Sequence, residues 1–170
     1  MEIKPLIESL LFVADEPVAI GRLAAAIGVK REAVEEALRV LSEEYEQRGL
    51  RLQRKGERVQ MVTAPEAAPH IERFLDLELS SRLSAPALET LAIVAYQQPV
   101  TRAEIEAVRG VNCDSVLRTL VSKGLIEEVG RLPQAGRPII YGTTFEFLQY
   151  FGLQDLAELP PLDEEEQDGS

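Results

Sequence analysis

The side chains that most often carry out chemistry in proteins are scarce in this chain. His70 is the only histidine and Cys113 the only cysteine, and neither has a partner at the spacing of a metal site or of a nucleophile–base pair. Neither a phosphate-binding loop nor a dinucleotide-binding motif is present. The acidic pairs Glu35–Glu36 and Glu43–Glu44 are typical of solvated helix faces. We therefore expect no catalytic residue, no metal, no cofactor and no enzymatic activity, with Cys113 as a small packing residue.

Binding is the chemistry that remains, and the second half of the chain favours it. Arginine and tyrosine are common anchors of protein interfaces, because each joins apolar contact to directional hydrogen bonding. Three of the five phenylalanines and two of the four tyrosines fall within residues 141–151. These aromatic residues either complete the core of a second domain or line an exposed groove.

Composition bounds the possible classes of protein. The chain has 170 residues, 45% hydrophobic and 28% charged, enough for two modest cores. Its single cysteine allows no disulfide framework, no signal peptide is recognisable, and no apolar run reaches the roughly 20 residues of a membrane span, so we expect a cytoplasmic protein. The net charge is −11, and residues 144–170 supply eight acidic residues and no basic ones. Residues 160–170 are predicted to be an acidic disordered tail, either a solvated end or an arm that competes for basic surfaces.

The second half of the chain repeats the first. Residues 17–38 align without a gap on residues 99–120, at an offset of 82, with seven identities in 22 positions. The identities include Gly28 and Gly110, each just after a short helical stretch, where glycine fits the left-handed conformation that ends a helix. Two copies of one small domain are therefore predicted.

Each copy has the element order of a winged helix. Helical spacing of apolar residues, followed by a period of two, predicts three helices and two strands in the first copy, at about 4–14, 18–27, 30–49, 50–54 and 59–63. The same pattern predicts the equivalent elements of the second copy at 88–96, 102–109, 113–123, 125–129 and 139–143. The fold class is mainly α with small β-hairpins, arranged as tandem winged-helix domains.

The predicted boundaries follow from these elements. They are an N-terminal winged-helix domain at 1–79, with an extra helix at 66–79, a linker at 80–84, a C-terminal winged-helix domain at 85–159, and the tail at 160–170. Ser84 is expected to cap the first helix of the second domain.

Winged helices most often bind DNA through the third helix, so the charge of that helix tests this function. In the first copy, residues 30–48 carry four basic and six acidic residues, which repel a phosphate backbone. The second copy is more ambiguous, because Arg118, Lys123 and Arg131 form a weakly basic surface opposed by acidic neighbours. The alternative function is therefore a dimeric winged-helix transcription regulator that loses DNA binding when these three residues are changed.

Several stretches of the second copy resemble a known family, bacterial segregation and condensation protein B. They are APALETLAIVAYQQPVTRAEIE at 85–106, RGVN at 109–112, GRP at 136–138, YGTT at 141–144, FL at 147–148 and FGL at 151–153. The order of tandem winged-helix domains extends the resemblance over the folded chain.

The resemblance implies a non-catalytic, nucleoid-associated subunit of the bacterial SMC condensin complex. Members of the family form homodimers and bind the kleisin subunit, segregation and condensation protein A, which bridges the heads of the SMC ATPase. The complex supports chromosome condensation and segregation, and ATP hydrolysis belongs to SMC. No membrane contact is expected, and direct DNA binding is expected to be weak or absent.

The family motif also suggests where these contacts lie. For the kleisin we expect a surface on the second copy that contains Tyr96, Arg102, Arg109, Arg137 and Tyr141. For the homodimer we expect apolar residues of the first helix and the extra helix, among them Phe12, Phe74 and Leu77. Arg109 and Arg137 have an alternative role, which is to tie helix and wing together.

Overall fold

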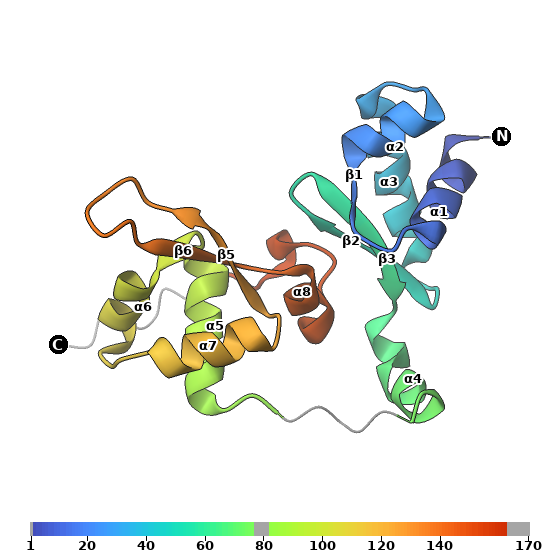
Figure 1. The fold of residues 1–170 in the computed structure, drawn as a ribbon. Coiled ribbons are helices and arrows are strands. Elements are labelled where there is room, and N and C mark those ends of the chain that lie inside the picture. The colour runs from blue at the N-terminus through green and yellow to red at the C-terminus, as the bar shows by residue number, and fades with distance from the viewer. Residues whose placement is uncertain (1, 77–81, 163–170) are drawn as a thin grey trace.

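A computed structural model describes residues 2–76 and 82–162, and these form two domains (Figure 1). Residues 77–81 and 163–170 lie outside the described residues. Leu77, the end of the expected helix at 66–79, part of the expected linker at 80–84 and most of the expected tail at 160–170 fall within these two gaps.

The first domain consists of three helices and a three-stranded antiparallel sheet. Its elements are α1 (Ile3–Val13), β1 (Val18–Ala19), α2 (Ile20–Ile27), α3 (Arg31–Tyr45), β2 (Leu50–Lys55) and β3 (Arg58–Thr63). The strand order is β1-β3-β2, so β2 lies at an edge of the sheet. The three helices pack apolar faces together around Ile7, Ile20 and Leu41, which are at most 1% exposed.

The second domain repeats this order. Its elements are α5 (Ala85–Gln97), β4 (Val100–Thr101), α6 (Arg102–Arg109), α7 (Asp114–Ser122), β5 (Ile126–Arg131) and β6 (Ile139–Thr143). The strand order β4-β6-β5 is equivalent to that of the first domain. Two further elements follow, α8 (Phe145–Phe151) and a 3₁₀ turn, η2 (Leu156–Glu158). The prediction of tandem winged-helix domains, mainly α with small hairpins, is confirmed.

Local signals begin and end the short helices as the sequence predicts. Gly28 and Gly110 adopt left-handed φ angles of 78° and 73° directly after α2 and α6, a conformation that costs other residues more. Ser84 caps the start of α5. α6 begins with a capping box, in which Thr101 and Glu104 each accept a hydrogen bond from the other's backbone N–H.

The helix expected at 18–27 begins only at Ile20. Val18 and Ala19 instead form β1, in which Val18 pairs with Val59 of the central strand. A β-branched residue packs well on a pleated surface, and here pairing with a distant strand outweighs the helical pattern. The same two-residue strand, β4, precedes α6 in the second domain.

The extra helix is shorter than expected and largely unpacked. A 3₁₀ turn, η1 (Pro65–Ala67), leads into α4 (Ala68–Phe74), which ends at Phe74. None of the residues of α4 is buried, and the helix projects from the first domain (Figure 1). The helix expected at 30–49 is also shorter, because α3 ends at Tyr45.

The aromatic residues of 141–151 divide between the core and the surface. Phe147 is 2% exposed, and Tyr141 and Phe145 pack against the same core. Tyr150 and Phe151 are 46% and 43% exposed. The centroid of the Phe151 ring lies 4.9 Å from that of Phe147 and 5.0 Å from that of Tyr150. The core interpretation therefore holds for Tyr141, Phe145 and Phe147, whereas Tyr150 and Phe151 are exposed at the surface.

The two domains are joined by buried hydrogen bonds between β2 and the segment after α8. Gln53 is 2% exposed. Its side-chain Nε2 donates to the Leu153 carbonyl at 2.8 Å, and its Oε1 accepts from the Gln60 side chain at 2.9 Å. The Arg54 backbone N–H donates to the Gln154 carbonyl at 2.7 Å. The segment thus occupies part of the open edge of β2 and protects it from other pairing.

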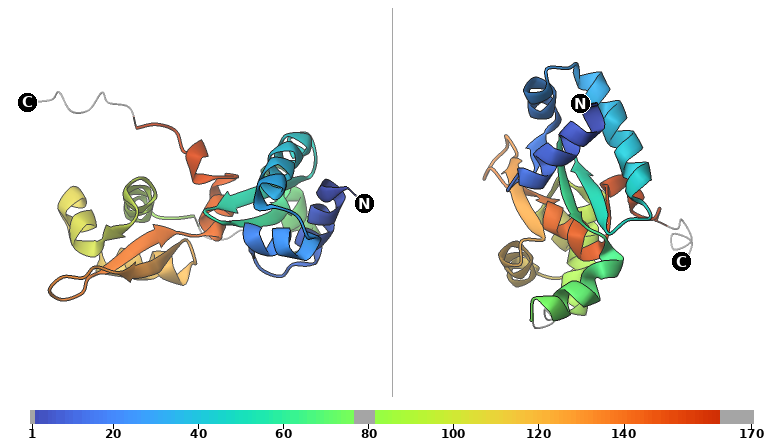
Figure 2. Two further views of the ribbon diagram at one scale, coloured as in Figure 1. Left: turned by 90° about the horizontal axis from the view of Figure 1, so that it is seen from above. Right: turned by 90° about the vertical axis from the view of Figure 1, so that its right-hand side faces the viewer.

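Two contacts surround this junction. Lys55 of β2 and Glu127 of β5 form an ion pair at 2.8 Å. Gly152 lies against Pro65 at a φ of +66°, and a Cβ there would lie 3.0 Å from the Pro65 ring, so another residue would be strained and would push this ring aside. The hairpin of the first domain accordingly lies beside α8 in both views of Figure 2.

Replacing Gln53 tests the contribution of this junction. We expect Gln53→Ala to lower the free energy of unfolding by about 2 kcal/mol, because the Leu153 carbonyl and the Gln60 amide lose their partner in a buried site. Urea denaturation measures the change, and Gln47→Ala, at an exposed position, is the matched control. Hydrogen exchange at the Arg54 N–H should accelerate at the same time. Equal denaturation midpoints for the two variants would show that the junction contributes nothing.

Candidate protein-binding surfaces

Arg102 and Tyr141 offer a cation and a phenol on the second domain. The Arg102 side chain is 54% exposed and pairs with Asp114 at 3.2 Å and Glu106 at 3.6 Å. Its charge also acts on the Tyr141 hydroxyl. Burial, with Glu128 adding to it, raises the pKa of Tyr141, so the hydroxyl remains a hydrogen-bond donor at neutral pH. The structure thus brings together two of the five residues expected to contact the kleisin.

Tyr96 is engaged by the chain's own C-terminal segment. It lies in the last turn of α5, and its hydroxyl donates to the Pro160 carbonyl at 2.6 Å. The residue is 36% exposed. Its ring is accessible, but its hydroxyl already has a partner.

Arg109 and Arg137 differ from each other. The Arg109 side chain is 10% exposed, and its Nη2 lies 3.4 Å from the Glu89 carboxylate, so it ties α6 to α5 rather than to the wing. Its Nε is buried and has no hydrogen-bond partner among residues 2–76 and 82–162. Arg137 is exposed in the loop between β5 and β6, where its carbonyl accepts from Arg131 at 3.0 Å. Arg137 is accessible to a partner, whereas Arg109 supports the helix packing.

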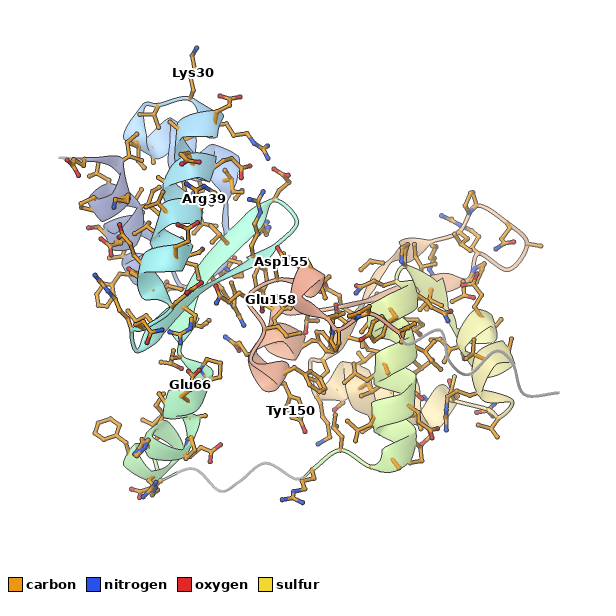
Figure 3. The ribbon with its side chains drawn as sticks, turned by 180° about the vertical axis from the view of Figure 1, so that it is seen from behind. Lys30, Arg39, Glu66, Tyr150, Asp155 and Glu158 are labelled. Atoms are coloured by element: carbon orange, nitrogen blue, oxygen red, sulfur yellow. The ribbon has the colours of Figure 1, made fainter. Side chains whose placement is uncertain are left out.

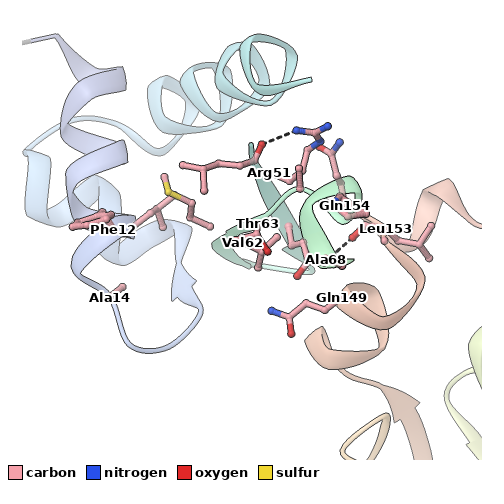
Figure 4. A pocket seen from close by; sticks show the side chains of 16 residues that line it. Phe12, Ala14, Arg51, Val62, Thr63, Ala68, Gln149, Leu153 and Gln154 are labelled. Atoms are coloured by element: carbon pink, nitrogen blue, oxygen red, sulfur yellow. Dashed lines mark hydrogen bonds between the residues drawn. The ribbon is translucent and has the colours of Figure 1, made fainter. Parts of the chain in front are cut away.

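The first domain exposes apolar side chains at the two expected positions. Phe12 at the end of α1 is 80% exposed and Phe74 at the end of α4 is 84% exposed. A hollow of about 530 Å³ adjoins Phe12, between α1, β3 and the end of α8, and Met61 and Leu153 contribute to its lining (Figure 4). Exposed aromatic residues beside a hollow are typical of protein interfaces.

The third helix of the first domain presents acidic residues and paired arginines. On α3, Arg31 pairs with Glu35 and Glu57, and Arg39 pairs with Glu36 and Glu43. The lowered pKa of Glu35 has the Arg54 hydrogen bond as its main cause. The acidic side chains Asp155 and Glu158 of the C-terminal segment share a hollow of about 370 Å³ with Arg39 (Figure 3). The α3 helix therefore presents no surplus of positive charge for a phosphate backbone.

The basic residues of the second domain that would favour DNA are also engaged. Arg118 pairs with Asp114 at 2.7 Å, and Arg131 donates to the Arg137 carbonyl. Asn112 accepts from the Asp114 N–H and so holds the start of α7. These contacts reduce the positive surface that the sequence suggests.

Comparison with known proteins identifies the family. Residues 5–162 match the family model described as segregation and condensation complex subunit ScpB. The chain belongs to the ScpB family. It is 52% identical to segregation and condensation protein B of Moorella thermoacetica, over 95% of this chain and 84% of that protein.

Two solved ScpB structures are also similar in sequence. The crystal structure of ScpB from Mycobacterium tuberculosis is 42% identical, with 89% of this chain and 96% of that chain covered and a TM-score of 0.43. The crystal structure of a dimer of an ScpB N-terminal domain complexed with an ScpA peptide is 27% identical, with 42% and 91% covered and a TM-score of 0.40. No helix among the described residues of this ScpB-family chain is long and apolar enough to cross a membrane.

Sequence reasoning missed the residues that hold the C-terminal segment in place. Gln53 stands in a strand as one polar residue among several, and nothing in the pattern marks it as buried. The motif predicts that Tyr96 contacts a partner, whereas in the structure its hydroxyl contacts Pro160 of the same chain. The leucine spacing of residues 153–162 does predict a segment that packs on the domain, and this prediction is confirmed, since Leu153, Leu156 and Leu159 pack against its core.

Cys113 is a packing residue, as expected, and this makes its reactivity predictable. It is fully buried at the start of α7, where its N–H donates to Glu106. Burial, followed by the charge of Glu106, raises the pKa of the Cys113 thiol, so less thiolate forms at a given pH. We expect a thiol reagent at pH 8 to modify the native protein at least about tenfold more slowly than the urea-unfolded chain. Equal rates would place the thiol at the surface.

Proposed function

We propose that this chain is a non-catalytic subunit of the SMC condensin complex, which forms a homodimer, binds the kleisin ScpA and supports chromosome condensation and segregation. The family match over residues 5–162, which spans both winged-helix domains, carries the proposal. The related ScpB N-terminal domain was crystallised as a dimer in complex with an ScpA peptide, so ScpA is the ligand to test. In this proposal the protein acts at the nucleoid and reaches the SMC ATPase through the kleisin, and ATP hydrolysis belongs to SMC.

The charge of the recognition helices supports a protein partner over DNA. Both arginines of α3 lie in ion pairs with glutamates, and Arg118 of α7 is paired with Asp114. A phosphate-binding surface needs a surplus of cations, because counterion release supplies much of the affinity. The fold alone does not decide this, since winged helices serve both purposes.

The proposal puts a kleisin contact on the second domain, centred on Arg102 and Tyr141, in addition to any contact made by the first domain, since the solved ScpA-peptide complex contains an ScpB N-terminal domain. Arg102 is half exposed, and Tyr141 retains a protonated hydroxyl, so both can form directional hydrogen bonds with a partner. Arg137 on the wing and the Tyr96 ring extend the surface. Arg109 supports it from below by holding α6 against α5.

Charge reversal tests this placement. We expect Arg102→Glu and Arg137→Glu each to weaken ScpA binding by about tenfold, because each replaces an exposed guanidinium at the proposed contact by a carboxylate. Isothermal titration with ScpA from the same organism gives the affinities, and light scattering on a size-exclusion column shows whether a larger complex forms.

Arg118→Glu is the matched control for this test. It changes the charge equally in the same domain, and because Arg118 shares the Asp114 carboxylate with Arg102, it shows how much of any loss comes from releasing Asp114 rather than from losing the Arg102 guanidinium. Equal losses for all three variants would contradict the placement. Failure to bind ScpA, together with salt-sensitive binding to short duplex DNA that Arg118→Glu abolishes, would favour the transcription regulator.

The exposed phenylalanines of the first domain test the homodimer. We expect Phe12→Ser and Phe74→Ser each to raise the dimer dissociation constant by at least about tenfold, since burial of such a ring contributes about 1.5 to 3 kcal/mol and each 1.4 kcal/mol is a factor of ten. Because both side chains are at least 80% exposed in the single chain, the monomer fold should persist. Val108→Ser, at a 56% exposed position of the second domain, is the control in sedimentation equilibrium. Unchanged dimerisation in both variants would move the interface elsewhere.

A further inference from the structure

The last described residues cross the end of α5 as a short extended strap, which we define as residues 159–162. After η2 the chain becomes extended at Leu159, with φ −58° and ψ 131°, close to polyproline II values. Leu159 packs against the core of the second domain. The Tyr96 hydroxyl then donates to the Pro160 carbonyl at 2.6 Å.

The strap is held weakly. Pro160 and Pro161 have no N–H to donate, and within the described residues the Tyr96 bond is the only hydrogen bond made by residues 160–162. Leu162 is 68% exposed. Apart from the Leu159 N–H bond to the Leu156 carbonyl within the turn itself, one hydrogen bond and one half-buried leucine hold the segment on the domain, and such a contact opens readily.

The position of the strap coincides with the surface proposed for the kleisin. Tyr96 belongs to that surface, and its hydroxyl cannot donate to a partner while it donates to Pro160. This surface of the second domain binds an extended segment of its own chain through a leucine side chain and a proline carbonyl. The same surface is chemically suited to an extended segment of the same kind from another chain.

We propose that residues 159–162 are an autoinhibitory strap, which an extended leucine- and proline-containing segment of the kleisin displaces from Tyr96. The inference rests on the proposed function for the identity of the partner. The strap is tethered, so it competes at a high effective concentration. The apparent kleisin dissociation constant is therefore the intrinsic constant divided by the fraction of molecules in which the strap is open.

Release of the strap should therefore strengthen kleisin binding. We expect Leu159→Ala, and separately the pair Pro160→Gly and Pro161→Gly, to tighten ScpA binding by about fivefold. The glycine pair leaves the core leucine in place, so it remains informative where Leu159→Ala destabilises the domain. Leu162→Ala is the control in the same segment, because this exposed side chain should leave the affinity unchanged. Unchanged or weaker binding in both release variants overturns the strap.

A peptide that copies residues 157–162 separates this inference from the proposed function. Labelled at one end, it should bind the release variants measurably and the unaltered chain at least about fivefold more weakly. Adding Tyr96→Phe to a release variant should weaken the binding of this peptide again. Peptide binding to the release variants without any ScpA binding would retain the strap and reject the kleisin as partner. No peptide binding to either release variant would reject the strap itself.

Discussion

The arrangement of the two domains depends on one buried side chain, Gln53. A buried amide is costly unless its donor and its acceptor are both satisfied, and here the partners are the Leu153 carbonyl and the Gln60 side chain. The next backbone N–H, that of Arg54, bonds the next residue of the same segment. Together these bonds fix where the chain passes after α8, and so they fix which face of the second domain meets the first. The close packing of Gly152 on Pro65 leaves little room for another arrangement.

A comparison of the two copies distinguishes the residues that the fold requires from those that are free to serve a function. Both copies keep the buried helix faces, the glycine after the second helix and the two-residue strand that completes the sheet. Their surfaces differ. α3 is acidic with both arginines in ion pairs, whereas α7 is nearly balanced, and only the second copy carries the long wing loop and α8. The buried positions specify the winged helix, and the charges on its outer face do not. These charges can therefore differ between the two copies without a change of fold.

Sequence reasoning recovered the parts of the structure that local signals determine. Apolar periodicity located the three helices of each winged-helix repeat, and Gly28 and Gly110 marked two helix ends, but α8 at Phe145–Phe151 was not predicted. It missed β1 and β4 because two residues carry no periodicity of their own, and their pairing depends on a strand some 40 residues away. Sequence reasoning also expected Arg109 either at the kleisin surface or between helix and wing. Its burial depends on Glu89 across the interface between α5 and α6, and residue spacing does not reveal that contact.

The C-terminal segment has two roles, and the geometry keeps them apart. Leu153 and Gln154 hold the first domain, whereas Leu159 and Pro160 cover Tyr96. Between them, the Asp155 carboxylate accepts from the Ala157 N–H at 2.9 Å, and the Glu158 carboxylate accepts from the Gln154 N–H at 2.8 Å. These two bonds brace the η2 turn from both of its ends. Movement of the chain beyond Glu158 therefore leaves the Gln53 junction intact, and the surface around Tyr96 can open without separating the two domains.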